Sequence, residues 1–304
     1  MLVLSEFLLR IVYNEPLASL VRHSTDTWGS WFNEENVRIS KTLGYEIVPN
    51  TRHYNSLGMP DAERTIKKTA DVSRIICVGD SVTARSQFPQ FLEQLLNEEQ
   101  SLCYEVWNAG IVGYSLKQEC LYIEEKLLVA EPDLVLIGFC WNDFDTTPLV
   151  ARVNDQLVGV FPSEEKLGLN PFLLRHSALY RLGVKGLFAL QRKKIGKQEG
   201  IVDETREQLL RTQTILTERG IPVVLVLLPM PVSLEENLGW YAFRQLIVIA
   251  EGCGIPYIDL RESVKGRTPG SMRIDADDAS HLNQDMGQVI AHKIKTYLTD
   301  HNYI

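Results

Sequence analysis

Long apolar stretches are missing from this chain of 304 residues. No run of 18 apolar residues occurs in it, so the sequence predicts no transmembrane helix. The first 20 residues lack a basic start, a long apolar core and a cleavage site, so we do not expect a signal peptide. We expect a cytoplasmic location; a natural N-terminus that begins earlier would leave a periplasmic or membrane-associated location open.

Clustered cysteine and basic charge are also missing. The five cysteines are scattered without CxxC spacing, and cysteine and histidine form no zinc pattern. An odd, unclustered number of cysteines favours a reducing compartment. The net charge is −8 and no long basic block occurs, so we expect neither nucleic acid nor an anionic membrane surface as a partner.

The composition is that of a globular protein with a full core, because 45% of the residues are apolar and 23% are charged. The length allows one large domain or two small ones. We predict an N-terminal arm, residues 1–70, packed on a main body of residues 71–304. Residues 2–11 show the apolar spacing of an amphipathic helix. The aromatic residues at positions 28–32 are too apolar to stay in water, and contact with a substrate or partner is the alternative to core packing.

From Arg74 onward, apolar runs alternate with segments of helical spacing. The predicted strands are Arg74–Gly79, Cys103–Trp107, Leu134–Phe139, Val223–Leu228 and Pro256–Leu260. The predicted helices cover residues 88–96, 116–128, 204–219, 234–253 and 285–298. This alternation predicts a parallel sheet with helices on both faces. Residues 145–200 interrupt it, and there we expect a helical insertion with a solvated basic tail, or else a lid over an active site.

The strand at Ile75–Val78 runs into Gly79-Asp80-Ser81 and then into a helical pattern. A serine there lies at the C-terminal edge of the sheet, where open α/β folds bind their ligands, and its amide lies near a helix N-terminus. An ordinary helix cap after a buried strand explains this stretch equally well.

Three further segments carry polar groups or glycines at strand ends. The second strand is followed by Asn108-Ala109-Gly110 and Gly113, and glycine lets a backbone N–H approach a ligand closely. The third strand is followed by Asn142, whose side chain is a neutral donor. Asp278 lies three residues before His281 and can fix its tautomer. Taken singly, each of these is as well explained by a turn or a surface loop.

Taken together and in this order, the four motifs resemble the SGNH (GDSL-type) hydrolases, a family of serine esterases and lipases, over residues 74–298. The resemblance implies a three-layer αβα sandwich with a central, mostly parallel five-stranded sheet of flavodoxin-like type. It also implies a set of functional residues: Ser81 as nucleophile, His281 as general base, Asp278 as its orienting partner, and Ser81, Gly113 and Asn142 as the oxyanion hole. Gly113 is preferred to Gly110 because it lies five residues after Asn108, as in the family.

The sequence departs from the family at Val82, where leucine is usual, and at Cys140, where the third motif often has glycine. Residues 55–58 resemble the lead-in of bacterial members found near polysaccharide pathways. The resemblance implies hydrolysis of an acyl ester, such as an O-acetyl group on a carbohydrate or a small lipid ester, through an acyl-enzyme and without metal or organic cofactor.

Other functions remain open from the sequence. The same residues would serve an O-acyltransferase if the site excluded water, and a non-catalytic binding protein could keep the fold. A phospho-acceptor role for Asp80 would need a lysine at a later strand end, and Pro229-Met230-Pro231 offers none. The substrate and the oligomeric state stay undetermined at this stage.

Overall fold

The computed structural model describes residues 6, 9, 32–51, 53–98, 103–144, 149–153, 156–160, 170–184, 199–231, 239–278 and 280–304. The chain divides into two compact units. The smaller one combines residues 1–51 with 145–201, and the larger one combines residues 52–144 with 202–304. Residues 52–70, which we had assigned to the N-terminal arm, thus group with the larger unit, and the packing of the arm on the main body stays a prediction.

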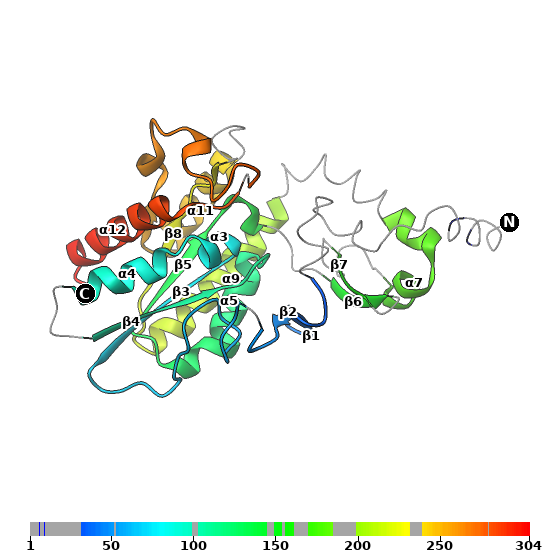
Figure 1. The fold of residues 1–304 in the computed structure, drawn as a ribbon, viewed down its shortest axis with the longest axis horizontal. Helices are drawn as coiled ribbons and strands as arrows, with labels where there is room; N and C mark the ends of the chain where they lie inside the picture. The colour runs from blue at the N-terminus through cyan, green and yellow to red at the C-terminus, as the bar shows by residue number, and fades with distance from the viewer. Residues whose placement is uncertain are drawn as a thin grey trace. The chain divides into compact units, whose positions relative to one another are not determined.

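The larger unit is built on five parallel strands (Figure 1). They are β3 (Val72–Gly79), β4 (Cys103–Gly110), β5 (Leu134–Phe139), β8 (Val223–Leu227) and β9 (Tyr257–Asp259). Their order in the sheet is β4-β3-β5-β8-β9. This is the 2-1-3-4-5 order of flavodoxin-like folds, so the predicted five-stranded parallel sheet is confirmed.

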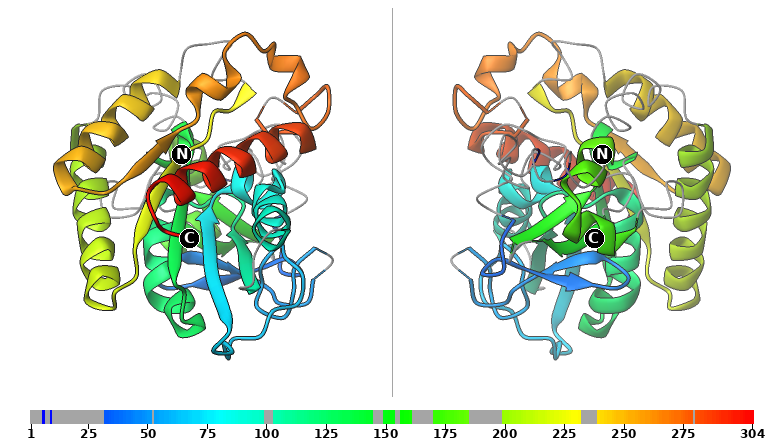
Figure 2. Two further views of the ribbon diagram at one scale, coloured as in Figure 1. Left: turned by 90° about the vertical axis from the view of Figure 1, so that its left-hand side faces the viewer. Right: turned by 90° about the vertical axis from the view of Figure 1, so that its right-hand side faces the viewer.

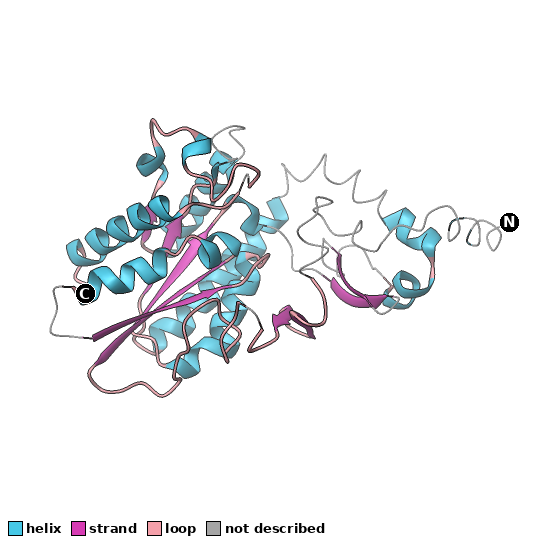
Figure 3. Ribbon diagram, in the orientation of Figure 1, coloured by secondary structure: helices cyan, strands magenta, loops and turns pink. Residues whose placement is uncertain are grey.

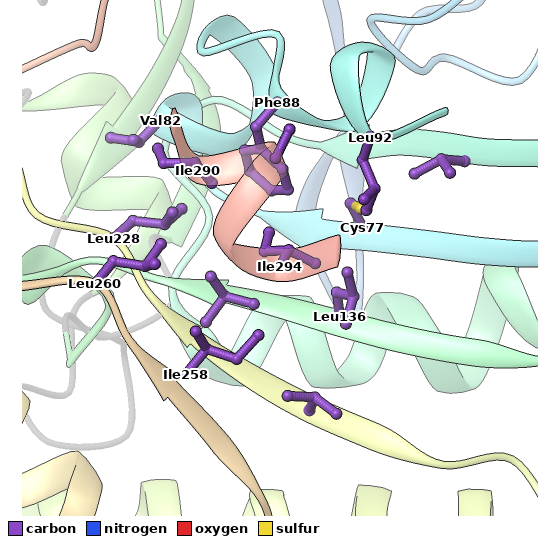
Figure 4. Close-up of a cluster of buried hydrophobic side chains, with 14 of the residues drawn as sticks. Cys77, Val82, Phe88, Leu92, Leu136, Leu228, Ile258, Leu260, Ile290 and Ile294 are labelled. Carbon is purple, nitrogen blue, oxygen red and sulfur yellow. The ribbon is translucent and has the colours of Figure 1, made fainter. Parts of the chain in front are cut away.

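Helices cover both faces of this sheet (Figure 2). One face carries α4 (Phe88–Asn97) and α12 (Gln284–Asp300), which pack on each other and enclose the core cluster of Figure 4. The other face carries α5 (Leu116–Tyr122), α9 (Glu199–Glu218) and α11 (Gly239–Cys253). The three-layer sandwich is therefore confirmed. In the described part of the chain, no helix is long and apolar enough to cross a membrane.

The central strands are buried along their whole length. Every residue of β5 and of β8 is buried, as expected for parallel strands covered on both faces. The third predicted strand agrees with β5 at both ends. The helix after β4 differs from its prediction, because α5 passes into a π-helical turn at Ile123–Leu127 and a 3-10 turn at Leu128–Ala130. Glu131 then takes a left-handed conformation with φ 52° before Pro132, which ends the helical segment.

The edge of strand β4 is closed by side chains rather than by another strand. Alternate N–H groups of β4 donate to carboxylate and amide oxygens of α4 and of the 52–70 loop. The three bonds are Tyr104 N to Asn97 Oδ1 at 2.9 Å, Val106 N to Glu93 Oε2 at 2.6 Å and Asn108 N to Asp61 Oδ2 at 3.1 Å. Arg64 links Asp61 and Glu93 at 2.9 and 2.8 Å. These contacts hold the loop on the sheet edge and block pairing with a further chain.

The smaller unit contains two antiparallel hairpins (Figure 3). One pairs β1 (Val37–Ser40) with β2 (Gly44–Ile47), and the other pairs β6 (Leu149–Val153) with β7 (Gln156–Val160). Helix α7 (Pro171–His176) and a helical segment at 178–184 follow. The predicted helical insertion thus contains helical segments at Pro171–His176 and 178–184, and it also contains a hairpin that the sequence did not predict.

The two chain segments of the smaller unit are joined by the carboxylate of Glu6. It accepts hydrogen bonds from Ser177 Oγ at 2.9 Å, Ala178 N at 2.7 Å and Leu179 N at 3.0 Å, and so caps the helical segment at 178–184. Phe32 is buried edge-on against Tyr45 within this unit. The predicted first helix, Trp28, Trp31 and the basic tail at 192–194 lie outside the described residues, apart from positions 6 and 9.

Gly287 provides a test of the packing between α12 and the chain after α3 (Ser81–Arg85). A Cβ atom at Gly287 would lie less than 3.0 Å from the Ser86 carbonyl oxygen. We expect Gly287→Ala to lower the free energy of unfolding by about 1–3 kcal/mol, because the backbone has to move to make room. Gly252→Ala in α11 is the control: nothing lies within 4 Å of its Cβ position, so alanine should be neutral or stabilising by up to about 1 kcal/mol. Chemical denaturation of both variants checks this, and equal effects would contradict it.

Candidate active site

Three glycines meet at the C-terminal ends of neighbouring strands. Gly79 of β3 pairs with Gly110 of β4 and with Gly138 of β5. A Cβ atom on any of them would lie less than 3.0 Å from Thr83 or Ala84 of α3. Only glycine therefore lets the short helix α3 lie this close across the ends of the three strands, and this explains the glycines of the first two motifs.

Ser81 is the first residue of α3 and is partly exposed. The cap of this helix is the residue before it: Asp80 is fully buried, and its Oδ1 accepts from the Val82 N–H at 2.7 Å. The helix cap that this stretch allows is therefore Asp80. Ser81 thus carries its hydroxyl at the C-terminal edge of the sheet without serving as the cap.

Asp278 and His281 form a tight pair in the turn before α12. Asp278 Oδ2 lies 2.7 Å from His281 Nδ1, and its Oδ1 accepts from the backbone N–H groups of Ser280 at 3.0 Å and His281 at 2.9 Å. Burial alone would raise the pKa of Asp278, but these hydrogen bonds and the His281 ring outweigh it and lower the pKa below its usual value. The pair assigns the proton of the neutral ring to Nδ1 and leaves Nε2 as the basic nitrogen.

The turn with His281 lies at the same sheet edge as α3. Arg85 at the end of α3 has a guanidinium nitrogen 3.9 Å from Asp278 Oδ2, and the Gly287 backbone packs against Ser86. Burial raises the pKa of Asp80 overall, although its hydrogen bonds from Asn142 and Val82 and the nearby His281 ring oppose this rise. Nε2 of His281 is buried and accepts no hydrogen bond from a described residue. A hydrogen bond to a nucleophile often forms only when substrate is bound.

Asn142 lies in the 3-10 turn η4 (Trp141–Phe144), directly after β5. Its Nδ2 donates to Asp80 Oδ2 at 3.0 Å, which fixes the amide beside the residue that precedes Ser81 and leaves one N–H for another acceptor. Asp80 therefore holds both the helix of Ser81 and the amide of Asn142. The cysteine at position 140 does not disturb this turn, since its N–H donates to Asp143 Oδ2 at 2.5 Å.

Gly113 follows β4 in a turn and has a φ of 79°. This left-handed conformation favours glycine. The other candidate, Gly110, uses its N–H in a hydrogen bond to Asn108 Oδ1 at 3.1 Å. Of the two glycines in the second motif, Gly110 thus has its N–H already engaged in a hydrogen bond.

One buried acid near these residues, Glu119 of α5, was not predicted from the sequence. Its side chain is fully buried, and burial together with the charge of Asp80 raises its pKa well above the usual value. Asp143 is also buried, and burial and the charges of Glu119 and Asp80 raise its pKa. The available signal was the position of Glu119 among Leu116, Cys120 and Ile123, on the apolar face of its helix.

The described residues contain no group of three or more histidine, cysteine, aspartate or glutamate side chains arranged to hold a metal ion.

Comparison with known proteins finds no matching family model and no matching curated protein. Solved structures do align. A lipase/acylhydrolase from Enterococcus faecalis is 16% identical with a TM-score of 0.47, over 75% of this chain and 96% of the other. An acetylxylan esterase from Geobacillus stearothermophilus is 14% identical with a TM-score of 0.48, over 74% and 93%. A GDSL-like lipase from Bacteroides thetaiotaomicron is 15% identical with a TM-score of 0.44, over 75% and 88%.

The Asp278–His281 pair predicts a pH-dependent contribution to stability. Because the pKa of Asp278 is lower in the folded chain than in the unfolded one, its contribution is present above about pH 4 and is lost as the pH falls through the folded pKa. We expect Asp278→Asn to lower the free energy of unfolding by about 1–3 kcal/mol at pH 7 and by clearly less below pH 3. Asp277→Asn removes an exposed charge in the same turn and serves as control. Urea unfolding at several pH values checks this, and a pH-independent difference would contradict it.

Proposed function

We propose that this chain is a serine esterase of the SGNH type, with Ser81 as nucleophile. The observation that carries the proposal is the Asp278–His281 pair, hydrogen-bonded at 2.7 Å at the same sheet edge as Ser81. A serine, a histidine with a free Nε2 and an orienting carboxylate are the groups that nucleophilic acyl transfer needs. The proposed substrate is an acyl ester, such as an O-acetyl group on a carbohydrate or a small lipid ester, as the motif resemblance implies.

In the proposed reaction, Nε2 of His281 removes the proton of the Ser81 hydroxyl while its oxygen attacks the ester carbonyl. Asp278 keeps the Nδ1 proton in place and stabilises the imidazolium that forms. The negative oxygen of the tetrahedral intermediate is held by the N–H groups of Ser81 and Gly113 and by the second Nδ2 proton of Asn142.

The intermediate then collapses to an acyl-enzyme. The alcohol leaves with the proton from His281, and a water molecule replaces it in the site. His281 takes a proton from this water as its oxygen attacks the acyl carbonyl. The bond to the Ser81 oxygen then breaks, His281 returns the proton to that oxygen, and the carboxylic acid leaves. An acceptor alcohol in place of this water would give acyl transfer, so product analysis in the presence of sugars distinguishes esterase from O-acyltransferase.

Ser81→Ala should abolish hydrolysis of short p-nitrophenyl esters, because no other group supplies the nucleophile. The wild type should be labelled by a fluorophosphonate probe at Ser81, as located by mass spectrometry of the peptide. Ser271→Ala, at an exposed serine of the 3-10 turn Pro269–Ser271, is the control and should keep activity and labelling. Undiminished turnover in Ser81→Ala would refute the assignment, and a folded wild type without labelling would favour a binding protein.

Asn142→Ala should lower kcat by about 10²–10³, the usual cost of losing one oxyanion donor. KM should change little, because the donor acts mainly on the charge that develops in the transition state. Steady-state kinetics on the same esters, with a thermal melt to show that the variant is folded, provide the measurement. A kcat within twofold of wild type would remove Asn142 from the oxyanion hole.

A further inference from the structure

Three carboxyl groups are buried around the turns that carry Ser81 and Asn142. Asp80 lies between β3 and α3, Glu119 lies on α5 and Asp143 lies in η4, and at most 1% of each residue is exposed. The proposed reaction uses none of them as acid or base. Three negative charges cannot be kept close together away from water at neutral pH, so the group as a whole holds at least one proton.

Hydrogen bonding shows which carboxyl is least able to carry a charge. Asp80 accepts from Val82 N at 2.7 Å and from Asn142 Nδ2 at 3.0 Å. Asp143 Oδ2 accepts from Cys140 N at 2.5 Å. Neither oxygen of Glu119 has a hydrogen-bond partner among the described residues, and Asp143 Oδ1 has none either. Glu119 would therefore be the least stable of the three as a buried anion, because no donor is bonded to it. Asp143 Oδ1 can accept a hydrogen bond from one more donor.

We propose that Glu119 is a positioning residue that stays protonated in the folded enzyme and donates its O–H to Asp143. Helix α5, which carries Glu119, packs against η4, which carries Asp143 and the adjacent Asn142. The hydrogen bond from Glu119 would hold η4 in place through Asp143. Asp80 holds the amide of Asn142 in the same turn through the hydrogen bond from Asn142 Nδ2. The protonation of Glu119 stands independently of the catalytic assignment, whereas its effect on catalysis rests on the proposed function.

The charges around Glu119 all act in the same direction. The charge of Asp80 at the β3–α3 junction disfavours a negative charge on Glu119, and a charge on Glu119 would in turn disfavour one on Asp143 in η4. The remaining ionisable neighbours are the thiols of Cys140, after β5, and Cys120, on its own helix, whose pKa values burial raises. Among the described residues, no cation contributes to the ionisation of Glu119.

The pH dependence of unfolding tests where the proton sits. Glu119 ionises near pH 4.3 in an unfolded chain, so above about pH 5 each unfolding event would release its proton. The unfolding constant of the wild type should then rise about tenfold per pH unit relative to that of Glu119→Gln, which cannot ionise. Glu125→Gln removes an exposed carboxyl from the next helical turn and should keep the wild-type dependence.

Two outcomes of this experiment would overturn the assignment. If the ratio of the unfolding constants of wild type and Glu119→Gln does not change with pH, Glu119 is ionised in the folded chain or plays a merely steric role. A tenfold dependence that persists in Glu119→Gln and disappears in Asp143→Asn would place the proton on Asp143. Infrared spectroscopy at neutral pH gives a second readout, since the wild type should show a carboxylic-acid carbonyl band that Glu119→Gln lacks.

Kinetics test the positioning role. Glu119→Gln keeps an N–H donor for Asp143 and should retain kcat within about threefold, whereas Glu119→Met keeps the volume without a donor and should lose about ten- to hundredfold in kcat with little change in KM. Equal activities of the two variants would refute positioning through Asp143.

If the esterase assignment itself fails, Ser81→Ala remains as active as the wild type, while the unfolding and infrared results still decide the protonation of Glu119.

Discussion

The close approach of α3 to the ends of three strands is the constraint on which the candidate site depends. Gly79, Gly110 and Gly138 stand side by side in the register of the sheet, and a side chain on any of them would push the helix away. With the helix seated there, Asp80 is buried and can cap α3 and hold Asn142 at once. The turn before Ser81 and the amide of Asn142 are thus joined through Asp80, at a place where three strand ends leave room for backbone alone.

Much of this arrangement follows from the sequence because its signals are local. Short continuous apolar runs such as Leu134–Phe139, which are bounded by turn residues, favour buried strands, and the segments between them repeat with helical spacing. Parallel strands bring their C-terminal ends to one edge, so Ser81, Asn142 and His281 could be placed near one another without coordinates. The hydrogen bond from His281 to Asp278 could be predicted from their separation of three residues alone.

The missed features lack such local signals. The hairpin strands β1, β2, β6 and β7 mix polar with apolar residues and contain no long continuous apolar run. The protonation of a carboxyl depends on what packs around it, so Glu119 looked like any polar residue of a helix until Asp80 and Asp143 were placed beside it. The same holds for Asp61, which accepts a hydrogen bond from the β4 edge and lies in a loop without regular structure.

The bond between Glu6 and Ser177 has a consequence for the order of synthesis. These residues are 171 positions apart, and the ribosome adds about 5–20 residues per second, so the carboxylate of Glu6 emerges roughly ten to thirty seconds before the helix that it caps. During that interval the larger unit is also incomplete, since β8, α11, β9 and α12 all follow position 201. The chain therefore passes through a stage in which Glu6 has been made and still lacks the helix that it caps.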